Sequence, residues 1–325
     1  MNTTDIFKID SEESFITHAL ETFRFQNKNN SVYKSFCDFL NVSPNSVTTL
    51  AQIPFLPIQF FKEKIILSTS NDPKTIFTSS GTTGSVTSKH YVTDISLYTD
   101  SYLKGFKAFY GSPKEYCILA LLPSYLEREG SSLIYMVNDL IKKSQHPKSG
   151  FFLNDFELLS QHLDELEATG QKTLLIGVSF ALLDFVEKYQ FQLKNTIVME
   201  TGGMKGRRKE LIRQELHEML IKGFGVDKIH SEYGMTELLS QAYSKGDSLF
   251  NCPPWMHILI RDTEDPLSYQ STGKTGGINV IDLANRNSCS FIATQDLGKS
   301  YAKGSFEILG RFDHSDIRGC NLMAL

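Results

Sequence analysis

The chain has 325 residues, of which 41% are hydrophobic and 22% charged, the composition of an ordinary globular protein with a sizeable core. Its net charge of −4 excludes the strongly basic surface that nucleic acid or an anionic membrane would need as a partner. No apolar run approaches the ~20 residues that span a bilayer, and the amino terminus lacks a signal-peptide core, so we expect a cytoplasmic protein without a membrane span.

Helices and strands are predicted to alternate over most of the chain. Apolar residues at helical spacing predict helices at 14–26 and 32–40, and Pro54 and Pro57 favour an extended segment at 53–62. Strands with almost continuous apolar residues are then expected at 75–80, 115–123, 172–179 and 196–203, and helices at 94–111, 131–144, 181–190 and 209–224. This alternation is typical of a mainly parallel sheet that helices cover on both faces.

From about Trp255 the pattern changes to short strands with turn signals between them. These strands are expected at 256–262, 276–283 and 305–311, and they predict an antiparallel or barrel-like part. We therefore expect an α/β fold in one domain over 1–325, with an α/β part at 1–250, a β-rich part at 251–310 and a short tail at 311–325.

A loop rich in small polar residues follows the strand expected at 75–80. Its glycines allow tight turns, through which several backbone amides can converge on an anion. The candidate anion-binding residues are Ser79, Ser80, Gly81, Thr82, Thr83 and Gly84. The loop is not of the Walker A type, because no Lys-Ser/Thr pair follows a glycine at the required spacing, although Lys89 could supply a mobile positive charge. Taken alone, a flexible surface loop explains this composition better.

A second motif, His-Ser-Glu-Tyr-Gly-Met-Thr-Glu, lies at 230–237. It brings an aromatic ring, a glycine, a hydroxyl and a carboxylate close together at Tyr233, Gly234, Thr236 and Glu237. Tyr233 could stack on a purine, Thr236 could donate to a phosphate, and Glu237 could hold Mg²⁺, which prefers oxygen ligands. The same residues can also begin a helix, with Thr236 as its N-cap and Glu237 in the first turn, and both interpretations can hold together.

Two further motifs, Thr-Gln-Asp-Leu-Gly at 294–298 and Gly-Arg-x-Asp at 310–313, complete an ordered set. In this order the four motifs resemble the adenylate-forming superfamily of acyl-CoA synthetases, luciferase and peptide-synthetase adenylation domains. Within it the chain is most similar to the acyl-protein synthetases of the LuxE type, the long-chain-fatty-acid–protein ligases of bacterial fatty-acid reductase systems. The segments that carry this narrower resemblance are 122–136, 201–211, 230–243 and 318–322.

The resemblance implies the large-domain fold of an adenylate-forming enzyme and an activity that uses ATP and Mg²⁺. A carboxylic acid, for this type a long-chain fatty acid, would become an acyl-adenylate and pass to a thiol. The matching positions imply that residues 79–84 bind the triphosphate and that the adenine is bordered by Gly202, Gly203 and Met204 and stacked on Tyr233. They also imply that Thr236 touches the α-phosphate, that Glu237 ligates Mg²⁺, and that the ribose is bound by Asp296 and Arg311.

The sequence departs from the superfamily pattern after Asp313, where only twelve residues follow. Members usually continue with a small terminal lid domain that carries a catalytic lysine. We therefore expect the lid to be absent, so that adenylation uses another cation, is slow or does not occur. The candidate cations are Lys89, Lys205, Arg207 and Arg208.

The five cysteines lie far apart and form no CxxC pair, which indicates reduced thiols. Acyl-protein synthetases of this type are thought to carry the acyl group on a cysteine near the carboxyl terminus, and the resemblance implies that Cys320 has this role. A thiol suits it, and the nine residues after Arg311 could extend over roughly 30 Å. A buried structural cysteine explains Cys320 equally well.

Two other functions stay open. The chain could be a ligase that loads an alkyl or aryl acid onto coenzyme A or a carrier protein, or a degenerate nucleotide- or acyl-binding subunit of a reductase complex. An acyl-CoA or acyl-protein reductase, or a carrier protein, is the expected protein partner.

Overall fold

The centre of the fold is one sheet whose two halves differ in strand direction. The structure, a computed structural model, describes residues 5–79, 86–123, 130–202 and 211–312. The parallel half comprises, in spatial order, β5 (Gly150–Phe151), β4 (Cys117–Leu121), β6 (Thr173–Val178), β7 (Thr196–Thr201) and β8 (His230–Tyr233). The residues of β4 and β6 are buried throughout, which explains the apolar runs that predict them, since neither face of these strands meets water.

The second half of the sheet is antiparallel. After β8 come β9 (Ala242–Ser244), β10 (Phe250–Asn251), β14 (Phe306–Arg311), β13 (Phe291–Ser300), β12 (Gly276–Asp282) and β11 (Met256–Arg261), and β1 (Leu56–Pro57) lies parallel to β13. The short strands expected at 256–262, 276–283 and 305–311 are confirmed. Because β8 pairs with β7 in parallel and with β9 antiparallel, the strand direction changes in the middle of a continuous sheet.

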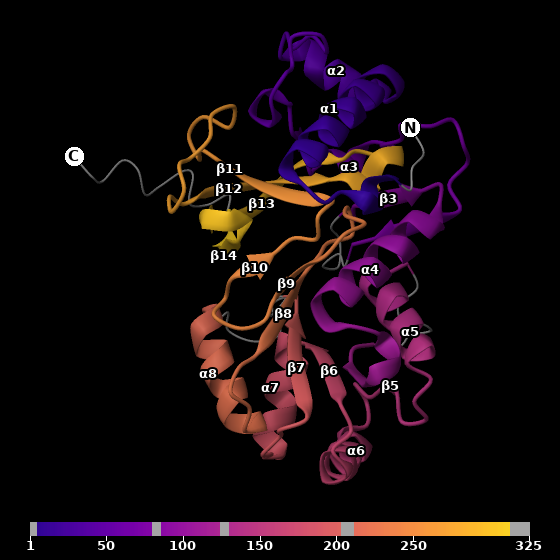
Figure 1. The fold of residues 1–325 in the computed structure, drawn as a ribbon, viewed down its shortest axis with the longest axis vertical. Helices are drawn as coiled ribbons and strands as arrows, with labels where there is room; N and C mark the ends of the chain where they lie inside the picture. The colour runs from indigo at the N-terminus through magenta and orange to yellow at the C-terminus, as the bar shows by residue number, and fades with distance from the viewer. Residues whose placement is uncertain (1–4, 80–85, 124–129, 203–210, 313–325) are drawn as a thin grey trace, which may run out of the picture.

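Helices cover both faces of the parallel half (Figure 1). In that view α4 (Ile95–Tyr110) and α5 (Ser132–Ser144) lie on one side of the strands, α7 (Ser179–Lys188) and α8 (Arg213–Phe224) on the other, and α6 (Phe156–Thr169) at the end. The side chains of β7 alternate accordingly: Met199 lines a cavity with residues of α4 and α5, while Glu200 approaches Arg213 of α8. This arrangement confirms the expected α/β architecture.

Two amino-terminal helices pack near the antiparallel half (Figure 1) and confirm the helices expected at 14–26 and 32–40. They are α1 (Glu12–Asn29), capped by the Ser11 hydroxyl, and α2 (Ser31–Phe39), capped by the Asn30 side chain. The remaining short helices are η1 (Asp5–Lys8), η2 (Leu50–Gln52), α3 (Phe60–Glu63), η3 (Pro113–Glu115), η4 (Leu283–Asn287) and η5 (Ala302–Gly304). None of the helices within the described ranges is both long and apolar enough to cross a membrane.

A buried group of hydrogen bonds joins α1 to η4 and the residues after it. The Gln26 side-chain amide donates to the backbone oxygens of Asn285 at 3.1 Å and Arg286 at 2.9 Å, and to the Ser290 hydroxyl at 3.2 Å. Its oxygen accepts the Ser290 backbone amide at 2.9 Å. These contacts span more than half of the chain, so α1 is anchored to the carboxyl-terminal half of the sheet.

The strand expected at 75–80 does not belong to the large sheet. It forms β2 (Thr75–Thr78), which pairs antiparallel with β3 (Lys89–Val92) in a separate two-stranded sheet. The prediction of a parallel strand here was therefore wrong, and β3 was missed. The physical reason is that the chain returns on itself after Ser79, where the Ser79 amide donates to the Ser88 carbonyl at 3.1 Å and prolongs the hairpin.

We expect Gln26→Leu to lower the free energy of unfolding by about 3 kcal/mol, because the buried backbone groups that Gln26 satisfies would each lose a partner at a cost of about 1–3 kcal/mol. Urea denaturation followed by circular dichroism measures the change. The matched control is Gln214→Leu on the exposed surface of α8, for which we expect less than about 0.5 kcal/mol. Equal effects of the two substitutions would contradict the anchoring role of Gln26.

Candidate active site

Tyr233, Asp296 and Arg311 come together although they lie far apart in the sequence. The Tyr233 hydroxyl donates to Asp296 Oδ2 at 2.7 Å, and Arg311 Nε donates to Asp296 Oδ1 at 3.0 Å. The register of β13 and β14 places Asp296 opposite Arg311. The Asp296 side chain is 8% exposed and that of Arg311 77%, so the cluster extends from the interior to the surface. Three residues that the sequence assigned to one nucleotide are thus neighbours.

The ring of Tyr233 is held between strands by two phenylalanines. Its centroid lies 6.1 Å from that of Phe250 and 5.8 Å from that of Phe306, both in edge-to-face geometry. Burial raises the pKa of Tyr233, and the carboxylate of Asp296 raises it further, so the hydroxyl is a neutral donor at physiological pH. The stacking of this ring on adenine stays a prediction.

Glu237 is a buried carboxylate close to the β2–β3 hairpin. The side chain of Ser88, which lies where the chain returns into β3, forms a hydrogen bond with it. Burial raises the pKa of Glu237, although the Ser88 bond and the charges of Arg311 and Lys62 act in the opposite direction. The carboxyl group forms no ion pair with any residue that the structure describes. It is therefore a carboxylate whose burial would be relieved by a cation.

The site fits a Mg²⁺ ion that would be coordinated by Glu237 and by a phosphate group. In the described part of the chain no three His, Cys, Asp or Glu side chains gather as a metal cluster. Mg²⁺ is commonly held by one or two carboxylates together with substrate phosphates and water. Glu237 can provide the carboxylate, so it is the described residue that would hold the metal.

The backbone beside Glu237 is fixed by a buried histidine. His90 Nδ1 lies 2.9 Å from the Thr236 carbonyl oxygen, and His90 Nε2 lies 2.9 Å from the Ser288 hydroxyl. Burial lowers the pKa of His90 to about 4, against the effect of the Thr236 bond, so the ring is neutral at physiological pH. The sequence analysis missed His90, which follows the predicted loop residues by six positions.

The helix that the sequence left open as an alternative after Thr236 does not form. The chain leaves β8 at Tyr233, makes a single turn and enters β9 at Ala242. The side chain of Asp282 explains this: its Oδ2 accepts the backbone amides of Leu239 at 2.8 Å and Ser240 at 2.9 Å. Amides held by a distant carboxylate are unavailable for an α-helical ladder, so the helix interpretation was wrong.

Gly202 follows the end of β7, in the segment assigned to adenine. It has φ +70°, a left-handed conformation that favours glycine, and its carbonyl accepts the Ser179 hydroxyl at 2.7 Å. Beneath it, Glu200 Oε1 lies 3.4 Å from Arg213 Nη1 and 3.6 Å from His217 Nε2. Burial opposes ionisation of Glu200, but His217 and Arg213 outweigh it and lower its pKa.

Among the other predicted residues, the structure describes Lys89 and Gly234 and leaves several undescribed. Lys89 is an exposed residue of β3, whereas its neighbours Ser88 and His90 are buried. Gly234 is half-buried, and a Cβ atom at its position would lie 2.5 Å from Glu232 Oε1. The predicted residues outside the described ranges are Ser80, Gly81, Thr82, Thr83, Gly84, Gly203, Met204, Lys205, Arg207, Arg208 and Cys320.

Glu232 is a buried acid that the sequence analysis did not single out. It lies on β8 directly before Tyr233, and its carboxyl group accepts a short hydrogen bond from the Thr201 hydroxyl. Burial raises its pKa to about 7; the Thr201 bond lowers it and the charge of Glu200 raises it. An acid directly before Tyr233, in a segment expected to lie at the site, was the signal that could have identified it.

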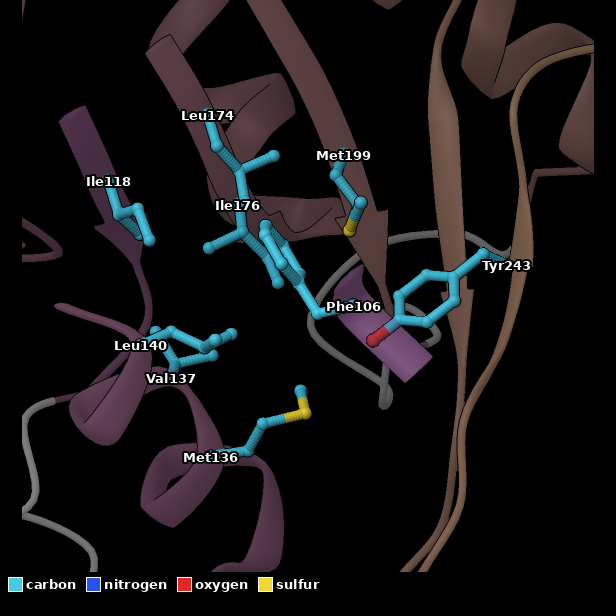
Figure 2. A pocket seen from close by; sticks show the side chains of 9 residues that line it. All are labelled: Phe106, Ile118, Met136, Val137, Leu140, Leu174, Ile176, Met199 and Tyr243. Carbon is cyan, nitrogen blue, oxygen red and sulfur yellow. The ribbon is translucent and has the colours of Figure 1, made fainter. Parts of the chain in front are cut away.

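Met199 of β7 and Tyr243 of β9 line a small apolar cavity (Figure 2). The cavity lies on the same face of the sheet as Glu232, because Met199 and Thr201 share one face of β7 and Tyr243 is the cross-strand partner of Glu232. The cavity of about 10 Å³ has room for about one water molecule. Its lining residues are Phe106, Ile118, Met136, Val137, Leu140, Leu174, Ile176, Met199 and Tyr243. Two of them are methionines, whose side chains adapt readily to neighbouring shapes.

Comparison with known proteins gives one family match. Residues 6–324 match the family model described as acyl-protein synthetase, LuxE. No curated protein matches the chain in sequence.

Solved structures give the fold. An open conformation of 2-hydroxyisobutyryl-CoA ligase in complex with 2-HIB-AMP and CoA is 9% identical, with a TM-score of 0.68 over 93% of this chain and 70% of the other. The same ligase in its postadenylation state has a TM-score of 0.70 and 10% identity, over 93% of this chain and 68% of the other. ATP-bound MatB from Rhodopseudomonas palustris is 19% identical, with a TM-score of 0.54 over 75% of this chain and 49% of the other. At these identities the similarity establishes a shared fold.

The raised pKa of Glu232 predicts how stability depends on pH. The folded protein holds this proton more tightly than the unfolded chain, so the contribution is complete below pH 4.5 and is lost as pH rises through about 7. We expect Glu232→Gln, which stays neutral and can still accept the Thr201 bond, to gain on the order of 3 kcal/mol relative to wild type between pH 4.5 and 8.5.

Urea denaturation at the two pH values measures this difference. Glu218→Gln on the exposed surface of α8 is the control and should show no such pH-dependent gain. A constant difference between Glu232→Gln and wild type at both pH values would mean that Glu232 is ionised throughout.

Proposed function

The chain belongs to the LuxE family of acyl-protein synthetases, and from this premise we propose that it activates a long-chain fatty acid with ATP and transfers the acyl group to a protein cysteine. The family and the fold are those of adenylate-forming, ATP-dependent acid ligases. Beyond the family and the fold, we propose the length of the fatty acid, the role of Mg²⁺ and the identity of the thiol acceptor. The division of the chain at residues 250 and 310 also stays a prediction.

The observation that carries the proposal is the cluster of Tyr233, Asp296 and Arg311. Asp296 has a buried carboxylate that already accepts one hydrogen bond on each oxygen, and the remaining lone pairs can accept the two ribose hydroxyls. Arg311, exposed beside it, can contact the ribose or a phosphate, since guanidinium suits planar and anionic groups. Tyr233 holds Asp296 in its orientation from the interior.

Adenylation requires a carboxylate to attack a triphosphate, two groups of like charge. In the proposed step a carboxylate oxygen of the fatty acid forms a bond to the α-phosphorus, and the bond from that phosphorus to pyrophosphate breaks. Thr236 would donate its hydroxyl to the α-phosphate, and the loop of residues 79–84 would offer amides and hydroxyls to the departing pyrophosphate. Glu237 would hold Mg²⁺, which neutralises phosphate charge when bound. Lys89, exposed at the base of this loop, would add a mobile charge.

The second proposed step is thiol attack on the acyl-adenylate. The Cys320 thiolate forms a bond to the carbonyl carbon, the bond to the phosphate oxygen breaks, and AMP leaves with the electron pair. Thiolates are the strongest side-chain nucleophiles near neutral pH and leave readily again, which suits an acyl carrier. The described cysteines Cys37, Cys117 and Cys289 are buried, and burial raises the pKa of each thiol, which makes them poor acceptors.

A second candidate function is a ligase that loads a short acid onto coenzyme A or a carrier protein. A short acid is the smaller demand on the apolar cavity, which has room for about one water molecule, so that Met136 and Met199 would have to move for any acid and furthest for a long acyl chain. A series of acids of increasing chain length separates the two candidates. If the chain only binds nucleotide for a partner reductase, calorimetry will show ATP binding while no acid supports turnover.

We expect fatty acids of long chain length to stimulate ATP–pyrophosphate exchange, and Asp296→Ala to raise KM for ATP about 10- to 100-fold. The reason is the loss of charge-assisted hydrogen bonds, which contribute about 1.5–3 kcal/mol each. Asp265→Ala, in the exposed turn between β11 and β12, is the control and should leave KM unchanged. Absence of exchange with every acid tested would rule out the proposed activation step.

Radiolabelled fatty acid with ATP should label the protein itself, and Cys320→Ser should abolish the label while exchange continues. Hydroxylamine sensitivity of the label identifies a thioester. Cys252→Ser replaces the half-buried cysteine of the described part and should keep the label. A label that persists in Cys320→Ser, or appears only on added coenzyme A, would refute Cys320 as the acceptor.

A further inference from the structure

His90 connects β3 to the turn whose residues Thr236 and Glu237 the proposed function assigns to phosphate and metal. It is a residue of β3, the strand that follows the loop of residues 79–84, and its side chain points toward the turn after β8. The residue is 1% exposed, and its ring meets Phe61 edge to face with centroids 5.7 Å apart. The imidazole is thus fixed on one side by apolar packing and has its two nitrogens free for polar contacts.

The partners of the ring determine its tautomer. The Thr236 carbonyl can only accept, so the nitrogen 2.9 Å away, Nδ1, must carry the hydrogen. In a neutral imidazole Nε2 is then an acceptor, and the Ser288 hydroxyl 2.9 Å away must donate to it. One neutral tautomer satisfies both contacts, and the ring links a backbone carbonyl to a hydroxyl near η4.

The turn that carries Thr236 and Glu237 is held by a second bond of the same kind. Asn285 Nδ2 donates to the Glu237 carbonyl at 2.7 Å. Ser288 is itself anchored, since its carbonyl accepts Asn30 Nδ2 at 3.0 Å and the Ser68 hydroxyl at 2.5 Å. Two successive carbonyls of the turn are therefore tied to the same well-anchored segment, one through His90 and one through Asn285.

We propose that His90 is a positioning residue for acyl-adenylate formation, which holds the Thr236 backbone and so sets the position of the Thr236 hydroxyl and of the Glu237 carboxylate beside Ser88. The inference rests on the proposed function for the identity of the reaction. It adds a residue that touches neither nucleotide nor metal and acts through the main chain. Of the two hydrogen bonds of the ring, the one that Nδ1 donates to the Thr236 carbonyl positions the turn.

Two amide substitutions separate the two hydrogen bonds of His90. The amide nitrogen of Asn lies as many bonds from Cα as Nδ1 of His, so His90→Asn can keep the donor to Thr236 and loses the contact with Ser288. The amide of Gln reaches as far as Nε2, so His90→Gln can keep the contact with Ser288 and loses the donor to Thr236. Each variant loses one buried hydrogen bond, which makes them a matched pair.

We expect His90→Gln to lower kcat of fatty-acid-dependent ATP–pyrophosphate exchange about tenfold, with KM for ATP changed less than threefold, and His90→Asn to keep kcat within about threefold of wild type. Ser288→Ala, which removes the outer hydrogen bond and a longer contact of 3.4 Å between the Ser288 hydroxyl and the Asn285 carbonyl, should behave like His90→Asn. Thermal denaturation should show similar losses of Tm for His90→Asn and His90→Gln, because each variant loses one buried hydrogen bond. A purely structural role would therefore lower kcat equally in the two variants. Equal kcat values for the two His90 variants would overturn the inference.

A binding measurement keeps this test independent of the proposed turnover. The probe is tetradecanoyl sulfamoyl-adenosine, a stable analogue of the acyl-adenylate, titrated by calorimetry into the full chain. His90→Gln should bind it about tenfold more weakly than wild type, and His90→Asn within about threefold. If the wild-type protein binds the analogue but shows no exchange, the proposed function is wrong. The affinities of the two His90 variants for the analogue then test the inference by themselves. Equal affinities of the two variants would overturn the inference alone.

Discussion

The turn between β8 and β9 is buried yet neither helix nor strand, and its backbone must find hydrogen-bond partners elsewhere in the chain. Asp282 accepts its later amides, while His90 and Asn285 donate to its earlier carbonyls. All three partners come from other elements, so the turn has its shape only when the hairpin, η4 and the sheet are in place. The residues that would act on phosphate and metal lie on this turn, and their geometry therefore depends on the whole fold.

Three buried carboxylates near the site show how neighbouring groups determine whether a buried acid is ionised. Glu200 has Arg213 and His217 beside it, and their effect exceeds the cost of burial, so its pKa is lowered. Asp282 accepts several hydrogen bonds but pairs with no cation among the residues that the structure describes, and burial raises its pKa to about 6. Glu232 has a single hydroxyl donor and the highest pKa of the three, about 7. The number and charge of donors decide which acid stays ionised.

The position of the site follows from the change of direction in the sheet. Gly202 and Tyr233 end two neighbouring parallel strands, β7 and β8, at the edge where α/β sheets commonly bind ligands. The antiparallel half adds Asp296 and Arg311 from β13 and β14 to the same place. Opposite halves of the sheet thus contribute to one cluster, while the apolar cavity lies on the face covered by α4 and α5 (Figure 1).

The sequence by itself determined the helices at 14–26 and 32–40, the buried and short strands, and the superfamily, because periodicity and ordered motifs are local properties of the chain. The resemblance of its motifs also implied that Tyr233, Asp296 and Arg311 surround one nucleotide. The sequence left open a helix after Thr236 that does not form, and it missed His90. Only the tertiary structure decided these points, because the groups that satisfy a buried backbone come from distant segments: His90 and Thr236 are 146 residues apart.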